Sequence, residues 1–515
     1  MSTSEPFALG QLAAALRELN IPNASAPALD RLPFAQSGAG FDYAGIAAAV
    51  VAEALHPPVS LPSPPLAGAT PSYYFLEPSI PAVPSPPPLS VPEFGGSAVP
   101  DFASGPRGFD PLLVKRDFPI LDERVDGRQL VWLDNAATTQ KPASVIARLK
   151  HFYEHENSNV HRGAHELAAR STDAYEGARE KARGFLNARS ANEIVFVRGA
   201  TEAINLVAQS WGRQNICDGD EIIVSHLEHH ANIVPWQQLA QEKGAKLRVI
   251  PVYDSGQILF DEYLKLLTPR TKIVSVTQVS NALGTVTPIK AIVEQARKNG
   301  VLTLVDGAQA VSHMRVNVQA IDCDWYVFSG HKVLGPTGIG VLYGREDLLN
   351  ASPPWQGGGN MIKDVTFERT VYQNAPSRFE AGTGNIADAV GLGAAIDYVT
   401  AIGMEAVEAY EHQLLGYATH RLGEIPGLKI IGTAAVKAGV LSFTFDGYKT
   451  EDLGGLLNKE GIAVRSGHHC AQPILRRFGL EATVRASLAL YNTCADIDAL
   501  VEALLRLRAG APPRI

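Results

Sequence analysis

Short apolar, β-branched runs alternate with helix-length segments over most of the chain from about Phe109 onward. Repeated strand–helix units of this kind predict a mostly parallel sheet that helices cover on both faces. The sequence therefore predicts an α/β fold, with a large domain over residues 129–397. The expected strands are residues 193–197, 221–224, 247–252, 273–276, 302–305, 325–328 and 339–342.

The spacing of apolar residues changes after about residue 400. The elements expected there are a long amphipathic helix over residues 404–425, a strand over 439–445 and a closing helix over 493–507. We interpret this region as part of a smaller α+β domain, formed by residues 109–128 and 398–515. The segment before Asp134 is expected to pack on this smaller domain.

Residues 1–108 differ in composition from the rest of the chain. Of the 34 prolines, 14 lie between residues 57 and 100, where only two residues are charged. Proline at this density removes backbone donors and prevents continuous helix or strand pairing, so we expect a largely disordered linker over residues 57–100. Two short apolar helices are expected ahead of it, at residues 9–19 and 41–55, and each is too short to be stable alone in water.

Composition indicates how many globular units the chain can form and which kinds of partner and compartment it suits. With 515 residues and 46% hydrophobic content, the chain is long enough for two or three globular units. A formal charge of -8 with mixed signs argues against a nucleic-acid partner, which would need a basic surface. The four cysteines form no CxxC pair, which argues against a disulfide framework or a metal site and suits a reducing cytoplasm. No apolar run reaches the roughly 18 to 20 residues of a membrane span, and the N-terminus lacks the charged region of a signal peptide.

Lys332 is the first candidate for chemistry. It follows the strand at residues 325–328 and precedes a glycine-rich turn. Ligands of α/β sheets sit beyond the carboxyl ends of strands, and a lysine there can form a Schiff base if its site allows deprotonation. Taken alone, a lysine at a strand end is more often a solvated surface charge.

Other strand ends strengthen this interpretation. Asp306 ends a strand, where its carboxylate could hold the proton of a pyridinium nitrogen. Thr201 lies where a strand leads into a helix, so backbone N–H groups and the helix dipole favour a phosphate. His229 follows a third strand and could stack on a ring and exchange protons with a substrate. Taken alone, each of these residues more often has a role in capping or core packing.

Seven motifs extend the pattern beyond single residues. They are LDNAATTQKP (133–142), SNVHRGAHELA (158–168), EHHANIVPW (228–236), VDGAQA (305–310), SGHKVLGPTGIGVLYG (329–344), RSGHHCAQP (465–473) and RASLALYNT (485–493). In their order and spacing, over about Phe109 to Leu507, these motifs resemble those of the cysteine desulfurases of the class V, fold-type I aminotransferase superfamily. The stretch RSGHHC, which ends in Cys470, is similar to the SUF-type group, which has a short Arg-x-Gly-x-His-Cys loop.

The resemblance implies a homodimeric pyridoxal 5′-phosphate (PLP) enzyme that converts L-cysteine to L-alanine. Cys470 would accept the sulfur as a persulfide and deliver it to a sulfur-acceptor protein, in support of iron–sulfur cluster assembly. By the same resemblance, Lys332 would form the Schiff base, Asp306 would contact the pyridine nitrogen of PLP and Gln309 its phenolic oxygen, and His229 would stack on the ring. The phosphate would be bound by Thr201, Ser329, His331 and the partner subunit's Thr383. The substrate carboxylate would be bound by Asn281 and Arg485.

The sequence leaves other enzyme activities to be weighed, and also a role without activity. A selenocysteine lyase shares the cofactor machinery and can share the cysteine. An aminotransferase or kynureninase-like enzyme would not need Cys470. A scaffold without activity is disfavoured because the residues for catalysis are intact. The other cysteines, Cys217, Cys323 and Cys494, are expected to be small buried apolar residues.

Residues 1–108 have no counterpart in most members of the family. Their short apolar segments and Pro-rich linker resemble the N-terminal extensions that load desulfurase cargo into encapsulin shells. This resemblance implies recruitment into an encapsulin compartment. An unstructured tail and a docking site for a different partner remain alternatives.

Overall fold

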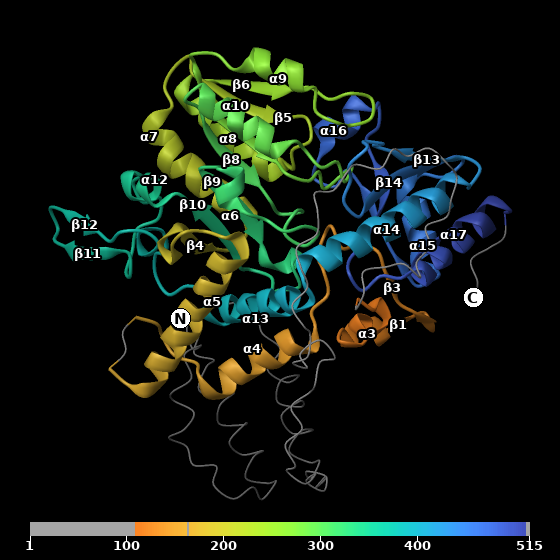
Figure 1. The fold of residues 1–515 in the computed structure, drawn as a ribbon, viewed down its shortest axis with the longest axis horizontal. Helices are drawn as coiled ribbons and strands as arrows, with labels where there is room; N and C mark the ends of the chain where they lie inside the picture. Colours follow the sequence, from red (N-terminus) through yellow and green to blue (C-terminus); the bar gives the residue numbers. More distant parts are fainter. Residues whose placement is uncertain (1–108, 162–163, 511–515) are drawn as a thin grey trace, which may run out of the picture. The chain divides into compact units, whose positions relative to one another are not determined.

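The computed structural model describes residues 109–161 and 164–510 (Figure 1). The expectations for residues 1–108, including the linker over 57–100 and the two short helices, lie outside these described residues.

A seven-stranded sheet forms the centre of the larger part of the fold, in the order β4-β10-β9-β8-β7-β5-β6 (Figure 1). Neighbouring strands from β9 to β6 are parallel, and β10 is antiparallel to both of its neighbours. The seven strands are β4 (Ile194–Val197), β5 (Glu221–Ser225), β6 (Lys246–Ile250), β7 (Thr271–Thr277), β8 (Leu302–Asp306), β9 (Trp325–Ser329) and β10 (Gly340–Gly344). The prediction of a mostly parallel sheet is confirmed.

Helices pack on both faces of this sheet. Along β4, Ile194 and Phe196 belong to one buried cluster and Val195 and Val197 to another, as the two-residue alternation of a strand requires. Helix α13 packs against both α4 and α5. The α-helices up to this point of the chain are α3 (Pro111–Arg116), α4 (Ala143–His155), α5 (Glu166–Leu186), α6 (Ala200–Val207), α7 (Arg213–Asn215), α8 (Val234–Lys243), α9 (Phe260–Leu266), α10 (Ile289–Lys298), α11 (Val318–Ile321), α12 (Glu346–Ala351) and α13 (Ile386–Ile402).

An antiparallel sheet follows in the order β13-β14-β17-β16. Its elements are β13 (Leu428–Ile431), β14 (Val440–Phe445), β16 (Arg465–Gly467) and β17 (Thr483–Ser487), with the helices α14 (Met404–Gly423), α15 (Thr450–Lys459), α16 (Gln472–Arg477) and α17 (Cys494–Arg508). The expected helices at 404–425 and 493–507 and the strand at 439–445 are thus present. The domain limits given above stay a prediction.

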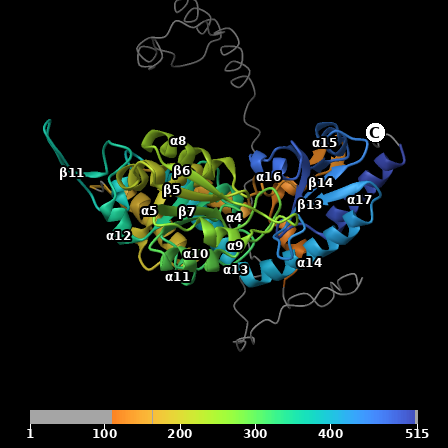
Figure 2. The ribbon, with the colours of Figure 1, turned by 90° about the horizontal axis from the view of Figure 1, so that it is seen from above.

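Short elements complete the described chain. Strand β3 (Val131–Trp132) pairs in parallel with β15 (Ile462–Ala463), so the segment before Asp134 joins the C-terminal region. The remaining elements are the strands β1 (Arg124–Val125), β2 (Arg128–Gln129), β11 (Ile362–Val365) and β12 (Thr370–Tyr372), the short 3-10 helices η3 (Pro119–Asp122), η4 (Ala191–Glu193), η6 (His230–Asn232), η7 (Gly330–Lys332) and η8 (Ser377–Phe379), and the π-helix η5 (Ala208–Gly212). Strand β11 extends away from the helices at one end of the large sheet (Figure 2).

Among residues 109–161 and 164–510, no single helix is both long and apolar enough to cross a membrane. Helices α13 and α14 meet these two criteria only as a pair, and the pair is bent by 75°.

Candidate active site

A cavity of about 220 Å³ lies at the carboxyl ends of the parallel strands, where ligands of α/β proteins bind. Asp306 is the last residue of β8 and Ser329 the last of β9. The segment after β16 and strand β17 complete its wall from the antiparallel sheet. The sequence-predicted residues that line this cavity are Thr201, His229, Asn281, Asp306, Gln309, Ser329, His331, Lys332, Cys470 and Arg485.

Lys332 ends the short turn η7, directly after β9. The turn is narrow at Gly330, where a Cβ atom would lie 2.9 Å from Cγ2 of Ile339. Burial lowers the pKa of Lys332 to about 8, and the charge of Arg485 acts in the same direction, while Asp306 opposes both. A substantial fraction of this amine is therefore neutral near physiological pH, as covalent chemistry with a carbonyl requires.

Asp306 lines the cavity with a carboxyl group. Its side chain is buried, and Oδ1 accepts a hydrogen bond of 2.9 Å from the N–H of Ala308. Burial raises the pKa of Asp306, whereas this hydrogen bond and the charge of Lys332 lower it. A carboxylate in this position can hold a proton on a pyridine nitrogen.

His229 is held in one tautomer. Its Nδ1 accepts the backbone N–H of Ala231 at 3.0 Å. Burial lowers the pKa of His229 to about 3, and the nearby charge of Lys332 contributes in the same direction. The ring is therefore neutral at physiological pH, and its proton is on Nε2.

Glu228, the residue before His229, was missed in the sequence analysis. It is fully buried, and Oε2 accepts from Nδ2 of Asn232 at 2.6 Å while Oε1 accepts from the N–H of Thr277 at 3.1 Å. Burial raises the pKa of Glu228 to about 8. The residue thus fixes the turn that carries His229 to the end of β7. Glu228 is part of the EHHAN motif, but no local sequence pattern shows whether a glutamate there is buried in a hydrogen-bond network or exposed on the surface.

The start of α6 provides donors for an anionic group. Ser329 Oγ accepts the N–H of Ala200 at 2.9 Å, which leaves its own hydroxyl proton free to donate. Gly199 allows this close approach, because a Cβ atom there would lie 3.1 Å from Ser329 Oγ. Burial lowers the pKa of His331 to about 4, so its ring is neutral. Thr201 lines the cavity from the first turn of α6.

Gln309 lines the same cavity, but its amide is already engaged. Its Nε2 donates to the backbone oxygen of Ala136 at 2.7 Å. This bond joins the turn after β8 to the segment that begins LDNAA, and the predicted contact of Gln309 with a phenolic oxygen stays a prediction.

Arg485 lines the cavity with a buried guanidinium group. It donates to the backbone oxygen of Asn281 at 2.9 Å and to Oδ1 of Asp134 at 3.1 Å, while its Nε has no hydrogen-bond partner in the described chain. Asp134, which the sequence analysis did not identify, also lies 3.7 Å from Arg465. Asn281 donates through Nδ2 to the backbone oxygen of His469 at 2.6 Å. Asp134, which does not line the cavity, therefore orients the guanidinium of Arg485.

Cys470 reaches the cavity on the segment between β16 and α16, and its side chain is partly buried. The prediction that the other three cysteines are buried is confirmed for Cys323, and burial raises the pKa of that thiol. It is wrong for Cys217, which is exposed because it lies in the loop between α7 and β5. Cys494 is partly buried at the start of α17.

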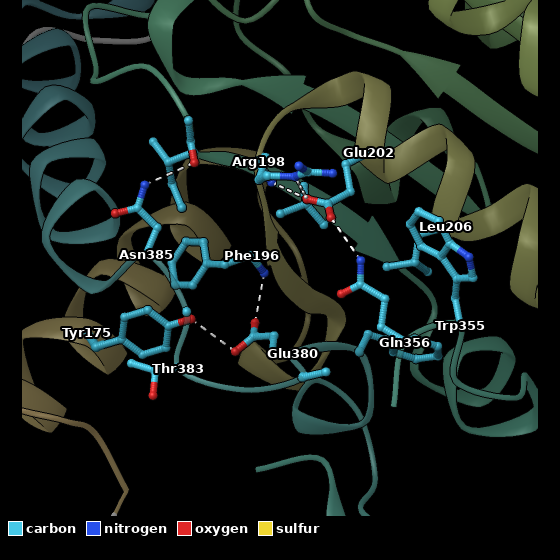
Figure 3. A pocket seen from close by; sticks show the side chains of 16 residues that line it. Tyr175, Phe196, Arg198, Glu202, Leu206, Trp355, Gln356, Glu380, Thr383 and Asn385 are labelled. Atoms are coloured by element: carbon cyan, nitrogen blue, oxygen red, sulfur yellow. Dashed lines mark hydrogen bonds and ion pairs between the residues drawn. The ribbon is translucent and has the colours of Figure 1, made fainter. Parts of the chain in front are cut away.

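Thr383 is the one predicted site residue that does not line this cavity. It lies instead in a second cavity of about 600 Å³, beside Tyr175, Glu380 and Asn385 (Figure 3). The predicted contact of Thr383 with a phosphate requires a second subunit, and it stays a prediction.

The fold and the residues at the strand ends define a fold-type I PLP-dependent transferase. The chain belongs to the class V aminotransferase family, whose model matches residues 131–500. It is 67% identical over 422 residues to a cysteine desulfurase of Synechococcus elongatus, a match covering 82% of this chain and 67% of that protein. It is 60% identical to a probable cysteine desulfurase of Mycobacterium leprae, covering 78% of this chain and 66% of that protein.

This chain thus spans about two thirds of the length of these two relatives. Among solved structures it is similar to the cysteine desulfurase CsdA of Escherichia coli, with a TM-score of 0.73 and 41% identity. That match covers 78% of this chain and 99% of the other.

The residues of the cavity fit PLP, the cofactor of this family. Lys332 offers an amine that is readily deprotonated, and Asp306 a buried carboxyl group. Ser329 keeps a free hydroxyl proton at the start of α6 for a phosphate. The buried Nε of Arg485, which lacks a partner in the described chain, leaves one donor for a further anionic group.

Proposed function

We propose that this enzyme is a SUF-type cysteine desulfurase, which converts L-cysteine to L-alanine and transfers the sulfur to Cys470. One observation carries the proposal: Cys470 and Lys332 line one cavity together with the buried guanidinium of Arg485. A transaminase would need the lysine and the arginine but not a thiol at this point.

The residues that line the cavity have distinct roles in the proposed reaction. Bound PLP supplies an electron sink that allows bonds at the α and β carbons of the substrate to break. Arg485 binds the substrate carboxylate, Lys332 takes and returns the proton at Cα, and His229 offers its Nε2 proton on one side of the cavity. The Cys470 thiolate attacks the substrate sulfur, so a new S–S bond forms as the Cβ–S bond breaks. The electron pair of the broken bond stays on the carbon fragment, which takes up a proton at Cβ, and the products are alanine and a persulfide on Cys470.

The purified protein tests this proposal directly. Supplied with L-cysteine and a reductant, it should release alanine and sulfide in equal amounts. Release of pyruvate or of a keto acid instead, with no sulfide, would reject the desulfurase assignment. The same assay with L-selenocysteine separates a desulfurase from a selenocysteine lyase, which would release selenide and leave L-cysteine unchanged.

Replacing Arg485 with alanine should weaken the binding of L-cysteine by roughly 10- to 150-fold, because a charge-assisted contact of about 1.5 to 3 kcal/mol is lost. The dissociation constant is measured from the change in visible absorbance on titration with cysteine. Arg476→Ala is the control, since this arginine pairs on the surface with Glu481. Equal affinities for Arg485→Ala and the parent would assign the carboxylate to another residue.

The functional assembly that we propose is a homodimer in which Thr383 of each subunit contributes to the phosphate site of the other. The sulfur would pass from Cys470 to an acceptor protein for iron–sulfur cluster assembly in the cytoplasm. Thr383 is exposed and lies outside the cavity that Lys332 of the same subunit lines, which supports this arrangement. Asn281 and Gln309 would complete the substrate and cofactor contacts through the donors that they have left.

Residues 1–108 are proposed to recruit the enzyme to an encapsulin shell. Each predicted catalytic residue lies after Leu133 in the sequence. The linker expected from the sequence of residues 57–100 supports this proposal, because a flexible chain of 44 residues spans on the order of 35 to 40 Å and would let apolar segments dock at a distance from the enzyme. Two extensions in a dimer would add avidity on a repetitive wall.

Deleting residues 1–108 should leave the rate of alanine formation unchanged and abolish co-purification with a co-expressed encapsulin shell. The reciprocal fusion of residues 1–108 to an unrelated protein should confer co-purification. A fusion protein that stays outside the shell rejects recruitment to a shell. A deletion that removes activity would instead make the extension part of the enzyme.

A further inference from the structure

The backbone at the proposed nucleophile adopts an unfavourable conformation. His469 and Cys470 have φ angles of 51° and 53°, in the left-handed region that residues with a Cβ atom seldom occupy. Two consecutive residues of this kind need support from their surroundings to keep their shape.

Hydrogen bonds from outside the segment supply part of this support. The carbonyl of Cys470 accepts the N–H of His230 at 2.7 Å, and the carbonyl of His469 accepts from Asn281 at 2.6 Å. The ring of His469 is anchored in turn, because its Nε2 lies 2.8 Å from Oγ1 of Thr483 on β17. The segment is therefore attached both to loops that follow strands of the large sheet and to β17 of the antiparallel sheet.

Two imidazole rings accept the backbone N–H groups on either side of the thiol. Nδ1 of His468 accepts the N–H of Cys470 at 3.0 Å. Nε2 of His230 accepts the N–H of Gln472 at 3.2 Å, at the start of α16, where no side chain of the helix itself provides a cap. The two rings lie with their centroids 5.7 Å apart, tilted by 32°.

We propose that His230 and His468 are positioning residues, whose ring nitrogens hold the Cys470 segment in the conformation that directs the thiol into the Lys332 cavity. The part of this inference that concerns sulfur transfer rests on the proposed function. Neither ring needs to touch the substrate for this role. Each acts by accepting one backbone N–H, so an uncharged acceptor at the same point replaces it.

The surroundings of His230 favour the accepting form. Burial lowers the pKa of His230, and the neighbouring His468 contributes in the same direction. His229, the adjacent residue on its own turn, is also neutral, with ring centroids 6.2 Å apart. At physiological pH the ring of His230 therefore has an unprotonated nitrogen that can accept the backbone N–H.

The test compares substitutions that remove the acceptor with ones that replace it. Glutamine places its Oε1 near the position of histidine Nε2, and asparagine its Oδ1 near that of Nδ1. The variants are His230→Ala and His230→Gln, His468→Ala and His468→Asn, with His420→Ala as a control because His420 is a partly exposed residue of α14 paired with Glu424. All are studied as full-length protein loaded with PLP.

Amide hydrogen exchange of the peptide that covers residues 466–475 is the first readout. His230→Ala should raise the exchange rate at Gln472 and His468→Ala that at Cys470, each by roughly five- to tenfold, the effect of one hydrogen bond. His230→Gln and His468→Asn should restore protection. This readout does not depend on activity, so it tests the positioning even if the proposed function fails.

The second readout is the single-turnover rate of alanine formation from L-cysteine. It should fall by a similar factor in both alanine variants and recover in the glutamine and asparagine variants, with unchanged visible absorbance of PLP. Equal exchange in the parent and the alanine variants would overturn the inference. So would a loss of protection that Gln and Asn fail to restore. A parent that forms no alanine rejects the desulfurase proposal but leaves the exchange result to decide the positioning role.

Discussion

Lys332→Ala should abolish the covalent attachment of PLP and lower the rate of alanine formation by at least about 10²- to 10⁴-fold, because the nucleophilic amine and the proton carrier are lost together. The measurement is the visible absorbance of the purified protein, followed by borohydride reduction and peptide mapping. The parent should carry the reduced cofactor on Lys332, and the variant should carry none.

Lys141 provides the matched control. Its pKa is also lowered to about 8 by burial, yet its Nζ already donates to Oγ1 of Thr138 at 3.3 Å and to the backbone oxygen of His331 at 3.4 Å. Lys141→Ala should therefore keep the covalent link. A Lys332→Ala protein that remains yellow, with a borohydride-stable adduct, would show that the cofactor lysine has been misidentified.

Cys470→Ser should lower alanine and sulfide release by at least about 10³-fold, because a serine hydroxyl is far less acidic than a thiol and does not attack sulfur at neutral pH. PLP binding and the affinity for L-cysteine should stay close to those of the parent, since Lys332, Asp306 and Arg485 are untouched. The measurements are initial rates and a spectral titration with cysteine.

Cys217→Ser is the control for this substitution, because Cys217 is exposed and does not line the cavity. Its rates should match those of the parent. If Cys470→Ser retained full sulfide release in the presence of reductant, the sulfur would leave without passing through Cys470.

The local elements were predictable because their signals are local. Runs of β-branched residues gave all seven strands of the large sheet, and the change in spacing after residue 400 gave α14, β14 and α17. The strand order was not predictable, because β10 lies between β9 and β4 and its pairing with β4 joins segments that are far apart in the sequence.

The residues of the site were predictable from the sequence, but the hydrogen bonds that hold them in place were not. Asp306 and Lys332 stand at strand ends, where an α/β sheet places its ligands, and the family motifs supplied Cys470 and Arg485. The anchoring of Arg485 by Asp134 joins residues 351 positions apart, and no pattern along the chain encodes it. The same holds for the hydrogen bond between the N–H of Gln472 and the ring of His230, which spans 242 positions.

The transfer of sulfur to Cys470 is the central claim, and mass spectrometry of the enzyme tests it most directly. The PLP-loaded protein is mixed with L-cysteine in the absence of reductant, and free thiols and persulfides are then alkylated before digestion. The account predicts that the peptide containing Cys470 gains the mass of one sulfur atom, in step with the alanine formed. Alanine formed with no added sulfur on that peptide, or sulfur found on Cys217 or Cys494 instead, would contradict it.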